Sequence, residues 1–202
     1  MNASLPKGVL EAIEHLSQLP GIGSRSAERL IFSLLKNKSG LDQKISNSLN
    51  NLRLSVRECE ECFHFCEKEK CGICGDSSRN EKLLCIVETP LDVVALERTH
   101  EYKGIYHVLH GIISPINKIK PEDLKIPELI HRLQKKKLFE EIILATSGSI
   151  EGDATAMYIC QQIKPFFKGK ISRIARGIPA GGDLDFLDLR TISRAITERR
   201  EF

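Results

Sequence analysis

Four cysteines stand in two closely spaced pairs and are the residues of this chain best suited to bind a metal. Cys59 and Cys62 form one CxxC pair, and Cys71 and Cys74 form a second pair a short loop later. Each CxxC turn directs both sulfurs to one point, so two facing turns supply the four thiolates of a tetrahedral Zn²⁺ site. Such a site leaves no position for water. We therefore expect a structural zinc that stabilises the fold and takes no part in chemistry.

Two further side chains, His64 and Cys66, lie between the cysteine pairs, and either can replace a zinc ligand. Neither belongs to a CxxC turn, so we expect both to stay outside the coordination shell. The alternative is that the cysteines are unrelated core residues, but this gives no reason for two CxxC pairs so close together. The remaining cysteines, Cys85 and Cys160, lie in an apolar run and an expected helix, and we expect them to pack in the core.

Two arginines follow a glycine-rich turn near the amino terminus and are suited to bind phosphate. In the turn LPGIG, Pro20 ends a first helix, and Gly21 and Gly23 permit positive φ angles and close backbone approach. Arg25 and Arg29 lie one turn apart on the next helix. This arrangement favours binding to the phosphates of a nucleic-acid backbone without sequence preference. The contacts would come from the N–H groups of the turn, the positive end of the helix and the guanidinium groups. The alternative is a helical hairpin whose charged face is only solvated.

Four carboxylates form the third group with chemical potential. Glu88 follows the apolar run LLCIV, and Asp92 lies one turn into the next helix, while Glu151 and Asp153 follow a later apolar run. Ligands of open α/β sheets bind at the carboxyl ends of the strands, and four carboxylates converging there suit Mg²⁺. The alternative is that Asp92 and Asp153 only stabilise helix amino termini.

These residues must be positioned by three regions of the chain. Residues 5–57 show helical periodicity, residues 58–79 form the cysteine loop, and residues 80 to about 180 alternate short apolar runs with helical patterns. Such alternation predicts a parallel sheet covered by helices. The expected strands are Leu83–Val87, Ile105–Leu109, Glu141–Ala145 and Ile171–Ala175, and the expected helices between them are Leu91–Arg98, Ile126–Lys136 and Asp153–Ile163.

The helices outside this sheet have apolar faces that need partners. The second helix of the hairpin is expected to begin near Ser24, a favourable N-cap residue. The helix after it, Leu41–Arg57, carries an apolar stripe that packs either in the protomer core or against another subunit. The tail Ile178–Phe202 is expected to contain a short amphipathic helix around Leu189–Ile196.

Composition limits the class of protein. The chain has 202 residues and is 41% hydrophobic, enough for two modest domains or one domain with appendages. It shows neither a long apolar run nor a signal-peptide pattern, so no membrane span is expected. Seven cysteines, four of them assigned to metal, indicate a reducing cytoplasm. The net charge is only +3, so DNA binding requires charge concentrated locally or several copies acting together.

Two segments resemble known domains. The hairpin is similar to the helix-hairpin-helix of non-specific DNA-binding proteins, and the sheet region resembles the Toprim domain of primases and topoisomerases. In Toprim domains a glutamate and an Asp-x-Asp motif bind Mg²⁺. Glu88 matches the glutamate, and Glu151-Gly152-Asp153 stands at the Asp-x-Asp position with its first aspartate replaced by glutamate. Thr89 replaces a usual glycine. The resemblance implies at most weak Mg²⁺ binding, and both departures disfavour phosphoryl transfer.

The order of motifs resembles the RecR family of bacterial recombination mediators over nearly the whole chain. The resemblance implies a helix-hairpin-helix region at 1–57, a four-cysteine zinc finger at 58–79, a Toprim domain at 80–176 and a C-terminal arm for oligomer contacts at 177–202. Its carriers are LPGIG with Arg25 and Arg29, the cysteine spacing, VETPLDVVALE, VLHGIISPINKI, ILATSGSIEGDATA and RIARGIPAGGDLDFLD.

This resemblance also implies a function. It predicts a non-catalytic DNA-binding clamp of recombinational repair, a tetrameric ring that acts with RecO and RecF to promote RecA loading. The acidic cluster would then recognise Mg²⁺ or a basic partner surface. The alternative is an Mg²⁺-dependent nuclease or topoisomerase-like enzyme of the Toprim class. All tyrosines (Tyr102, Tyr106 and Tyr158) lie inside the α/β region, which disfavours a topoisomerase and leaves a nuclease open.

Overall fold

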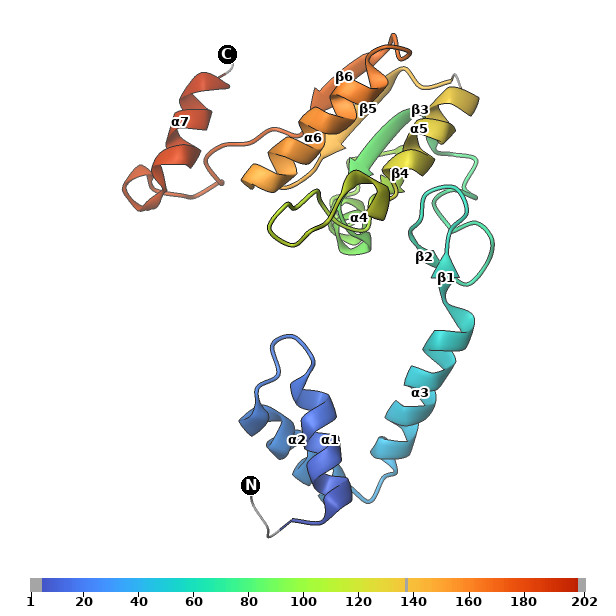
Figure 1. Cartoon of the computed structure of the whole chain (residues 1–202), viewed down its shortest axis with the longest axis vertical. Helices are drawn as coiled ribbons and strands as arrows, with labels where there is room; N and C mark the ends of the chain where they lie inside the picture. Colours follow the sequence, from blue (N-terminus) through green and yellow to red (C-terminus); the bar gives the residue numbers. More distant parts are fainter. Residues whose placement is uncertain (1–4, 137, 200–202) are drawn as a thin grey trace. The chain divides into compact units, whose positions relative to one another are not determined.

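The computed structural model describes residues 5–136 and 138–199. The chain divides into two compact units, Met1–Val56 and Arg57–Phe202, and each is described by itself (Figure 1). Among the described residues, no helix combines the length and the apolar character needed to cross a membrane.

The first unit consists of three helices: α1 (Lys7–Ser17), α2 (Ser24–Lys36) and α3 (Leu41–Ser55). α1 and α2 pack together as a helical hairpin, in which Ala27 is fully buried. The helical prediction for this region is confirmed, but α3 ends two residues before the predicted Arg57 because Arg57 enters a short strand.

The turn between α1 and α2 is formed by the LPGIG segment. The N–H of Ile22 donates to the carbonyl of Leu19 (3.0 Å), and Gly21 has φ +82°, a conformation that favours glycine. α2 begins at Ser24, as predicted, but Ser24 is not its N-cap. Gly23 is the N-cap, because its carbonyl accepts the N–H of Ala27 (2.9 Å) and so closes the first helical turn one residue earlier.

The second unit is built on a four-stranded sheet. Its strands, in the order β4-β3-β5-β6, are all parallel, which confirms the predicted parallel α/β architecture. The strands are β3 (Asn80–Val87), β4 (Gly104–Val108), β5 (Glu141–Ala145) and β6 (Lys170–Arg173). β5 has the predicted ends, whereas β3 begins three residues earlier than predicted and β6 ends two residues earlier.

Alternate side chains of the strands enter two separate cores. Leu84, Ile86 and Ile142 face the core that α5 (Ile126–Lys135) and α6 (Ile150–Ile163) cover. The opposite core contains Cys85, Val87, Tyr106 and Val108 from the strands, Val93 from α4 (Pro90–Glu97), and Phe63 and Ile73 from the cysteine loop. The cysteine loop therefore packs against one face of the sheet together with α4.

Short elements connect and extend this sheet. The cysteine loop contains a two-stranded antiparallel ribbon, β1 (Arg57–Glu58) and β2 (Phe65–Cys66), which the sequence did not indicate. η1 (Pro121–Asp123) precedes α5. The tail contains η2 (Leu184–Phe186) and α7 (Leu189–Thr197), close to the predicted helix.

Candidate functional site

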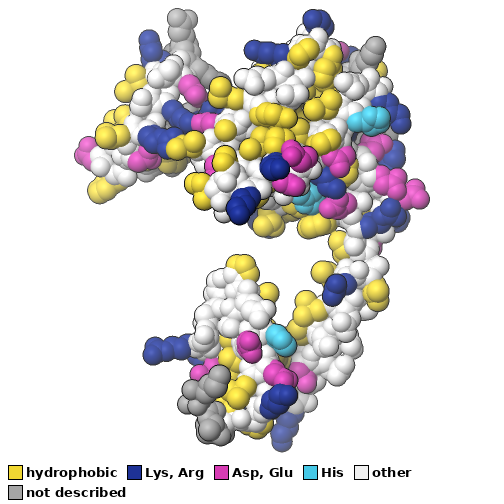
Figure 2. Space-filling model, in the orientation of Figure 1, with side chains coloured by type: hydrophobic (Ala, Val, Ile, Leu, Met, Phe, Trp, Pro, Cys, Tyr) yellow, Lys and Arg dark blue, Asp and Glu magenta, His cyan; other side chains and the backbone are white. Residues whose placement is uncertain are grey.

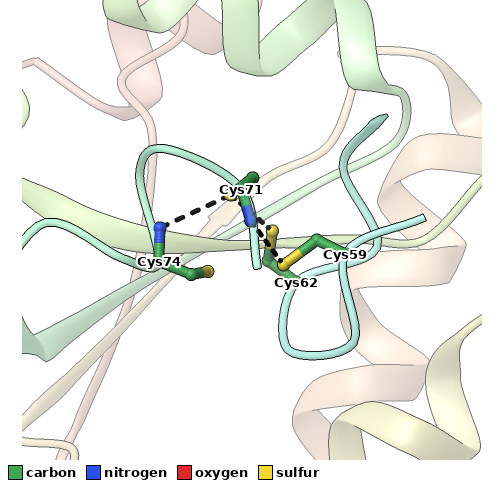
Figure 3. A group of neighbouring side chains, drawn as sticks. All are labelled: Cys59, Cys62, Cys71 and Cys74. Carbon is green, nitrogen blue, oxygen red and sulfur yellow. Dashed lines mark hydrogen bonds between the residues drawn. The ribbon is translucent and has the colours of Figure 1, made fainter. Parts of the chain in front are cut away.

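The cysteine loop brings its four predicted metal ligands together. The sulfurs of Cys59, Cys62, Cys71 and Cys74 all lie within 4.8 Å of one another (Figure 3). A tetrahedral site with 2.3 Å Zn–S bonds requires sulfurs about 3.8 Å apart. The Cys62 and Cys71 sulfurs are 3.5 Å apart. Backbone N–H groups also point at the sulfurs, from Cys71 to Cys59 (3.3 Å) and from Cys74 to Cys71 (3.4 Å). The donor set fits Zn²⁺.

The four clustered sulfurs form an environment that favours binding of a cation. Interaction with the Cys71 sulfur, then with Cys74, together with burial, raises the pKa of the Cys62 thiol. Four thiolates in so small a space repel one another, and a divalent cation removes that repulsion. Cys66 is outside the four-sulfur group; its thiol donates to the carbonyl of Lys68 (2.8 Å). His64 is also outside the group, as predicted.

The cysteine loop is hydrogen bonded to the edge of the sheet. The N–H of Val108, in the edge strand β4, donates to the carbonyl of Cys62 (2.8 Å). A ring nitrogen of His110 hydrogen bonds to the carbonyl of Phe63 (2.7 Å), and the Phe63 ring packs edge-on against His107. The metal-binding loop thereby covers backbone groups that an edge strand otherwise leaves unpaired.

The arginines of the hairpin are free to contact a ligand. Arg25 and Arg29 are both exposed in the first two turns of α2. The N-cap residue Gly23 has no side chain to accept hydrogen bonds from the first N–H groups of the helix, so these remain accessible to an anion. Gly21 and Gly23 have open space where a side chain would lie, so this end of α2 offers an unobstructed approach to backbone and guanidinium groups.

Glu88 and Asp92 line one pocket at the carboxyl edge of the sheet. The pocket has a volume of about 500 Å³ and is also lined by Ser147 and Gly148 before α6. Glu88 accepts the N–H of Ser147 (2.6 Å). Asp92 accepts the N–H of Thr89 (2.7 Å) and its hydroxyl (3.0 Å), and so forms a capping box at the start of α4. For Asp92, the helix-stabilising alternative is therefore correct, although its side chain still borders the pocket.

The other two acidic residues have different partners. Glu151 accepts a hydrogen bond from the hydroxyl of the buried Ser114. Asp153 forms ion pairs with three arginines, Arg173 (2.7 Å), Arg176 and Arg194. α6 begins at Ile150, three residues earlier than predicted, because the Ser149 hydroxyl accepts the N–H of Gly152 (2.9 Å).

The predicted convergence of four carboxylates is not found. Among the residues that the structure describes, the four cysteines form a group that can hold a metal ion, and the carboxylates do not. The reason is that Glu151 points to Ser114 and Asp153 is surrounded by guanidinium groups. Three arginines pair with Asp153, so at least this carboxylate of the edge is not available to coordinate Mg²⁺.

The three arginines are functional candidates that the sequence reasoning missed. They come from β6, from the segment after it, and from α7, and their shared partner Asp153 lies in α6. Arg194 also donates to the carbonyl of Gly148 (3.0 Å) and, with Thr191, lines the pocket of Glu88. Sequence spacing provided no signal for Arg194, because its partners Asp153 and Gly148 lie 41 and 46 positions away in the chain.

Comparison with known proteins agrees with this arrangement. A family model of the Toprim domain matches residues 82–175. Three RecR models match the helix-hairpin-helix at 9–53, the four-cysteine zinc finger domain at 56–76 and the C-terminal region at 177–200. Fold and site therefore define a Toprim-domain protein with a helix-hairpin-helix and a structural zinc finger.

Full-length relatives narrow this class to one family. The chain is 46% identical to the recombination protein RecR of Herpetosiphon aurantiacus, over 97% of this chain and 95% of that protein. It is 44% identical to RecR of Desulfosudis oleivorans, over 96% of each chain. It is 41% identical to RecR of Myxococcus xanthus, over 97% of this chain and 98% of the other. The chain belongs to the RecR family of recombination proteins, and it carries that family's structural zinc finger with four cysteine ligands.

Proposed function

We propose that this protein is a non-catalytic DNA-binding clamp of recombinational repair. The observation that carries the proposal is the exposed pair Arg25 and Arg29, at the start of a helix that follows a glycine turn. Such an arrangement binds phosphates through guanidinium and backbone N–H groups and reads no bases. Family membership supports the same role, since the relatives are named recombination proteins and the RecR helix-hairpin-helix model matches residues 9–53 of this chain.

The state of the acidic edge supports a role without catalysis. Metal-dependent phosphoryl transfer needs carboxylates that are free to coordinate cations. Here Asp153 is paired with three arginines and Asp92 caps α4. Glu88 and Asp92 remain partly exposed at a pocket. We assign them to recognition of a basic surface on RecO or RecF, through which the clamp promotes RecA loading.

Several copies of the chain are needed for tight DNA binding. One chain has a net charge of only +3. Exposed apolar side chains on α3 and in the C-terminal arm offer surfaces for self-association (Figure 2). They include Leu49 (60% exposed) and Leu52 (57%) on α3, and Phe186 (87%) and Leu189 (84%) in the arm. We propose that these faces join protomers into a tetrameric ring whose combined arginines act multivalently.

Zinc completes the proposal as a structural element. We assign Cys59, Cys62, Cys71 and Cys74 as its ligands, since their sulfurs form the compact group and Cys66 lies outside it. The metal would hold the loop whose Phe63 and Ile73 close one core of the sheet.

The experiment that tests the function measures binding and cleavage together. The zinc-loaded protein is titrated into labelled duplex and single-stranded DNA, with and without Mg²⁺, and compared with the Arg25→Ala/Arg29→Ala variant. We expect sequence-independent binding that the double variant nearly abolishes, and intact DNA throughout. Normal binding by the variant, or Mg²⁺-dependent cleavage by the wild type, would overturn the proposal.

A further inference from the structure

A second pocket lies at the amino edge of the sheet, opposite the edge that carries Glu88. It has a volume of about 420 Å³, within the range of about 300 to 1,000 Å³ common for ligand sites. It lies where α5 and α6 end and where β5 and β6 begin. Its lining combines three aromatic rings with lysines and an amide: Leu133, Gln134, Lys136, Phe139, Phe166, Phe167, Lys168 and Gly169.

Two of the three aromatic side chains of this pocket pack against the core of the sheet. Phe139 is 8% exposed and forms part of the core beneath the pocket, whereas Phe166 is 36% exposed. Gly169 allows the Phe167 ring to lie directly on the backbone, because a Cβ at Gly169 would come within 2.5 Å of that ring. Phe139 and Phe167 thus hold part of the pocket's flat apolar surface in a defined position.

The charge around the pocket is positive, and part of it is unpaired. Lys136 pairs with Glu61 (3.0 Å), and the nearest acidic residues of the strands are already neutralised: Glu140 by Lys82 (2.6 Å) and Glu141 by Lys170 (3.1 Å). Within residues 5–136 and 138–199, no carboxylate lies within 4.0 Å of the Lys168 ammonium group. The rim is therefore complementary to an anion.

The centre of the pocket has the opposite preference. α5 ends at Lys135 and α6 at Ile163, so the carbonyl ends of two helices border it. These ends carry the partial negative charge of the helix dipoles, although the carbonyl of Ile163 already accepts the N–H groups of Phe166 (3.2 Å) and Phe167 (2.9 Å). A carboxylate inserted at the centre would be repelled there. A neutral, flat group, flanked by negative charge that reaches Lys168, fits both the centre and the rim.

We propose that this pocket binds a nucleotide unit of single-stranded DNA. The base would stack on Phe166 and Phe167, Gln134 would contact its edge, and Lys168 would pair with an adjacent phosphate. The inference rests on the proposed DNA-binding function and adds a second contact to it. The hairpin contacts the backbone alone, whereas this pocket distinguishes strands with accessible bases from duplexes.

Two ligands of equal charge separate the pocket from the hairpin. Fluorescence anisotropy is measured with a labelled oligothymidine and with an abasic oligomer of the same length. The wild type should bind oligothymidine about tenfold more tightly, because stacking on aromatic side chains supplies the difference. Phe166→Ala should bring the ratio of the two dissociation constants to about one, and Phe166→Trp should preserve it.

Lysine and hairpin variants complete the test. Lys168→Ala should weaken both ligands about equally and reduce the salt slope by about 0.7, whereas Lys103→Ala, which removes an exposed lysine elsewhere, should have little effect. Arg25→Ala/Arg29→Ala should lower affinity for both ligands but retain the ratio. If that double variant binds duplex DNA normally, the hairpin function fails, and the oligothymidine-to-abasic ratio still tests the pocket.

Three results would overturn the pocket assignment. The first is a wild-type ratio near one, and the second is a ratio that Phe166→Ala leaves unchanged while zinc content and melting temperature stay normal. The third concerns protein partners. It is that an acidic peptide containing phenylalanine binds the wild type and binds Phe166→Ala more weakly, while Phe166→Ala leaves the oligothymidine-to-abasic ratio unchanged. The pocket would then serve a protein ligand.

Discussion

Asp153 shows how single side chains decide what the sheet edge can do. Partial burial on its own would raise the pKa of Asp153. Three arginines outweigh this effect and lower the pKa: Arg176 acts by a hydrogen bond and by its charge, Arg173 by its charge, and Arg194 by a hydrogen bond. A carboxylate with a lowered pKa in the folded state stabilises the fold above its unfolded pKa of about 3.9. That contribution is lost as the pH falls through the lower, folded-state pKa.

Replacing Asp153 should therefore loosen the C-terminal arm. Asp153→Asn removes the charge that holds Arg194 of α7, and we expect a loss of about 1.5–3 kcal/mol in unfolding free energy, since each lost hydrogen bond involves charged groups. Chemical denaturation at pH 7 measures this loss, and the difference from wild type should shrink as the pH falls below about 3.9 and disappear once the pH is below the folded-state pKa of Asp153. Asp185→Asn, an exposed aspartate of the arm, is the control. Equal stability of Asp153→Asn and wild type would show that the ion pairs contribute nothing.

The zinc ligands permit an equally direct test. Serine at Cys59, Cys62, Cys71 or Cys74 should lower zinc content and melting temperature together, because metal binding in such loops supplies folding free energy. Cys66→Ser is the matched control, since the Cys66 thiol bonds to a backbone carbonyl outside the group. Metal analysis and a chromophoric chelator report the occupancy. Loss of zinc in Cys66→Ser to the same degree as in Cys71→Ser would refute the ligand assignment.

At the scale of elements, the hairpin is expected to carry most of the DNA affinity. Arg25→Ala and Arg29→Ala should each weaken binding without changing sequence preference, and each should lower the slope of log affinity against log salt by about one on duplex DNA. Both side chains are exposed, so folding should survive. Anisotropy titrations at several salt concentrations measure the slope. An unchanged slope in the double variant would mean that the charged face is only solvated.

The elements also show what the sequence could and could not predict. A short apolar run predicted both ends of β5, and two CxxC turns predicted the four-sulfur group, because both depend on local sequence. The start of α6 was missed because the Ser149 hydroxyl caps it from outside the apolar pattern. The neutralisation of Asp153 was missed for another reason: Arg194 reaches it through tertiary packing, which spacing along the chain does not encode.

At the scale of the whole molecule, self-association should determine affinity. Leu189→Asp, placed on the exposed apolar face of α7, should shift the mass measured by light scattering to smaller species. DNA affinity should fall with it, because fewer arginines then act on one strand. Ile116→Asp, at a loop residue that is 87% exposed, is the control and should change neither quantity. An unchanged mass for Leu189→Asp would exclude α7 from the oligomer contacts.

In the whole assembly, variants at the Glu88 pocket should impair partner recognition and leave DNA binding intact. Glu88→Gln with Asp92→Asn removes two negative charges at the pocket, and the amide oxygen introduced by Asp92→Asn can still accept the hydrogen bonds of the α4 capping box. We expect normal affinity for DNA and loss of RecO or RecF binding, measured by calorimetry. Glu88→Ala alone should weaken the partner less, because one carboxylate remains.

The same variants decide between mediator and enzyme. The wild type should leave labelled DNA intact with Mg²⁺ or Mn²⁺, because Asp153 is paired with three arginines and is not free to coordinate a cation. Cleavage that requires Mg²⁺ and disappears in Glu88→Ala would make the sheet edge an active site. If a partner binds the Glu88→Gln/Asp92→Asn variant normally, the recognition surface must instead lie elsewhere on the Toprim domain.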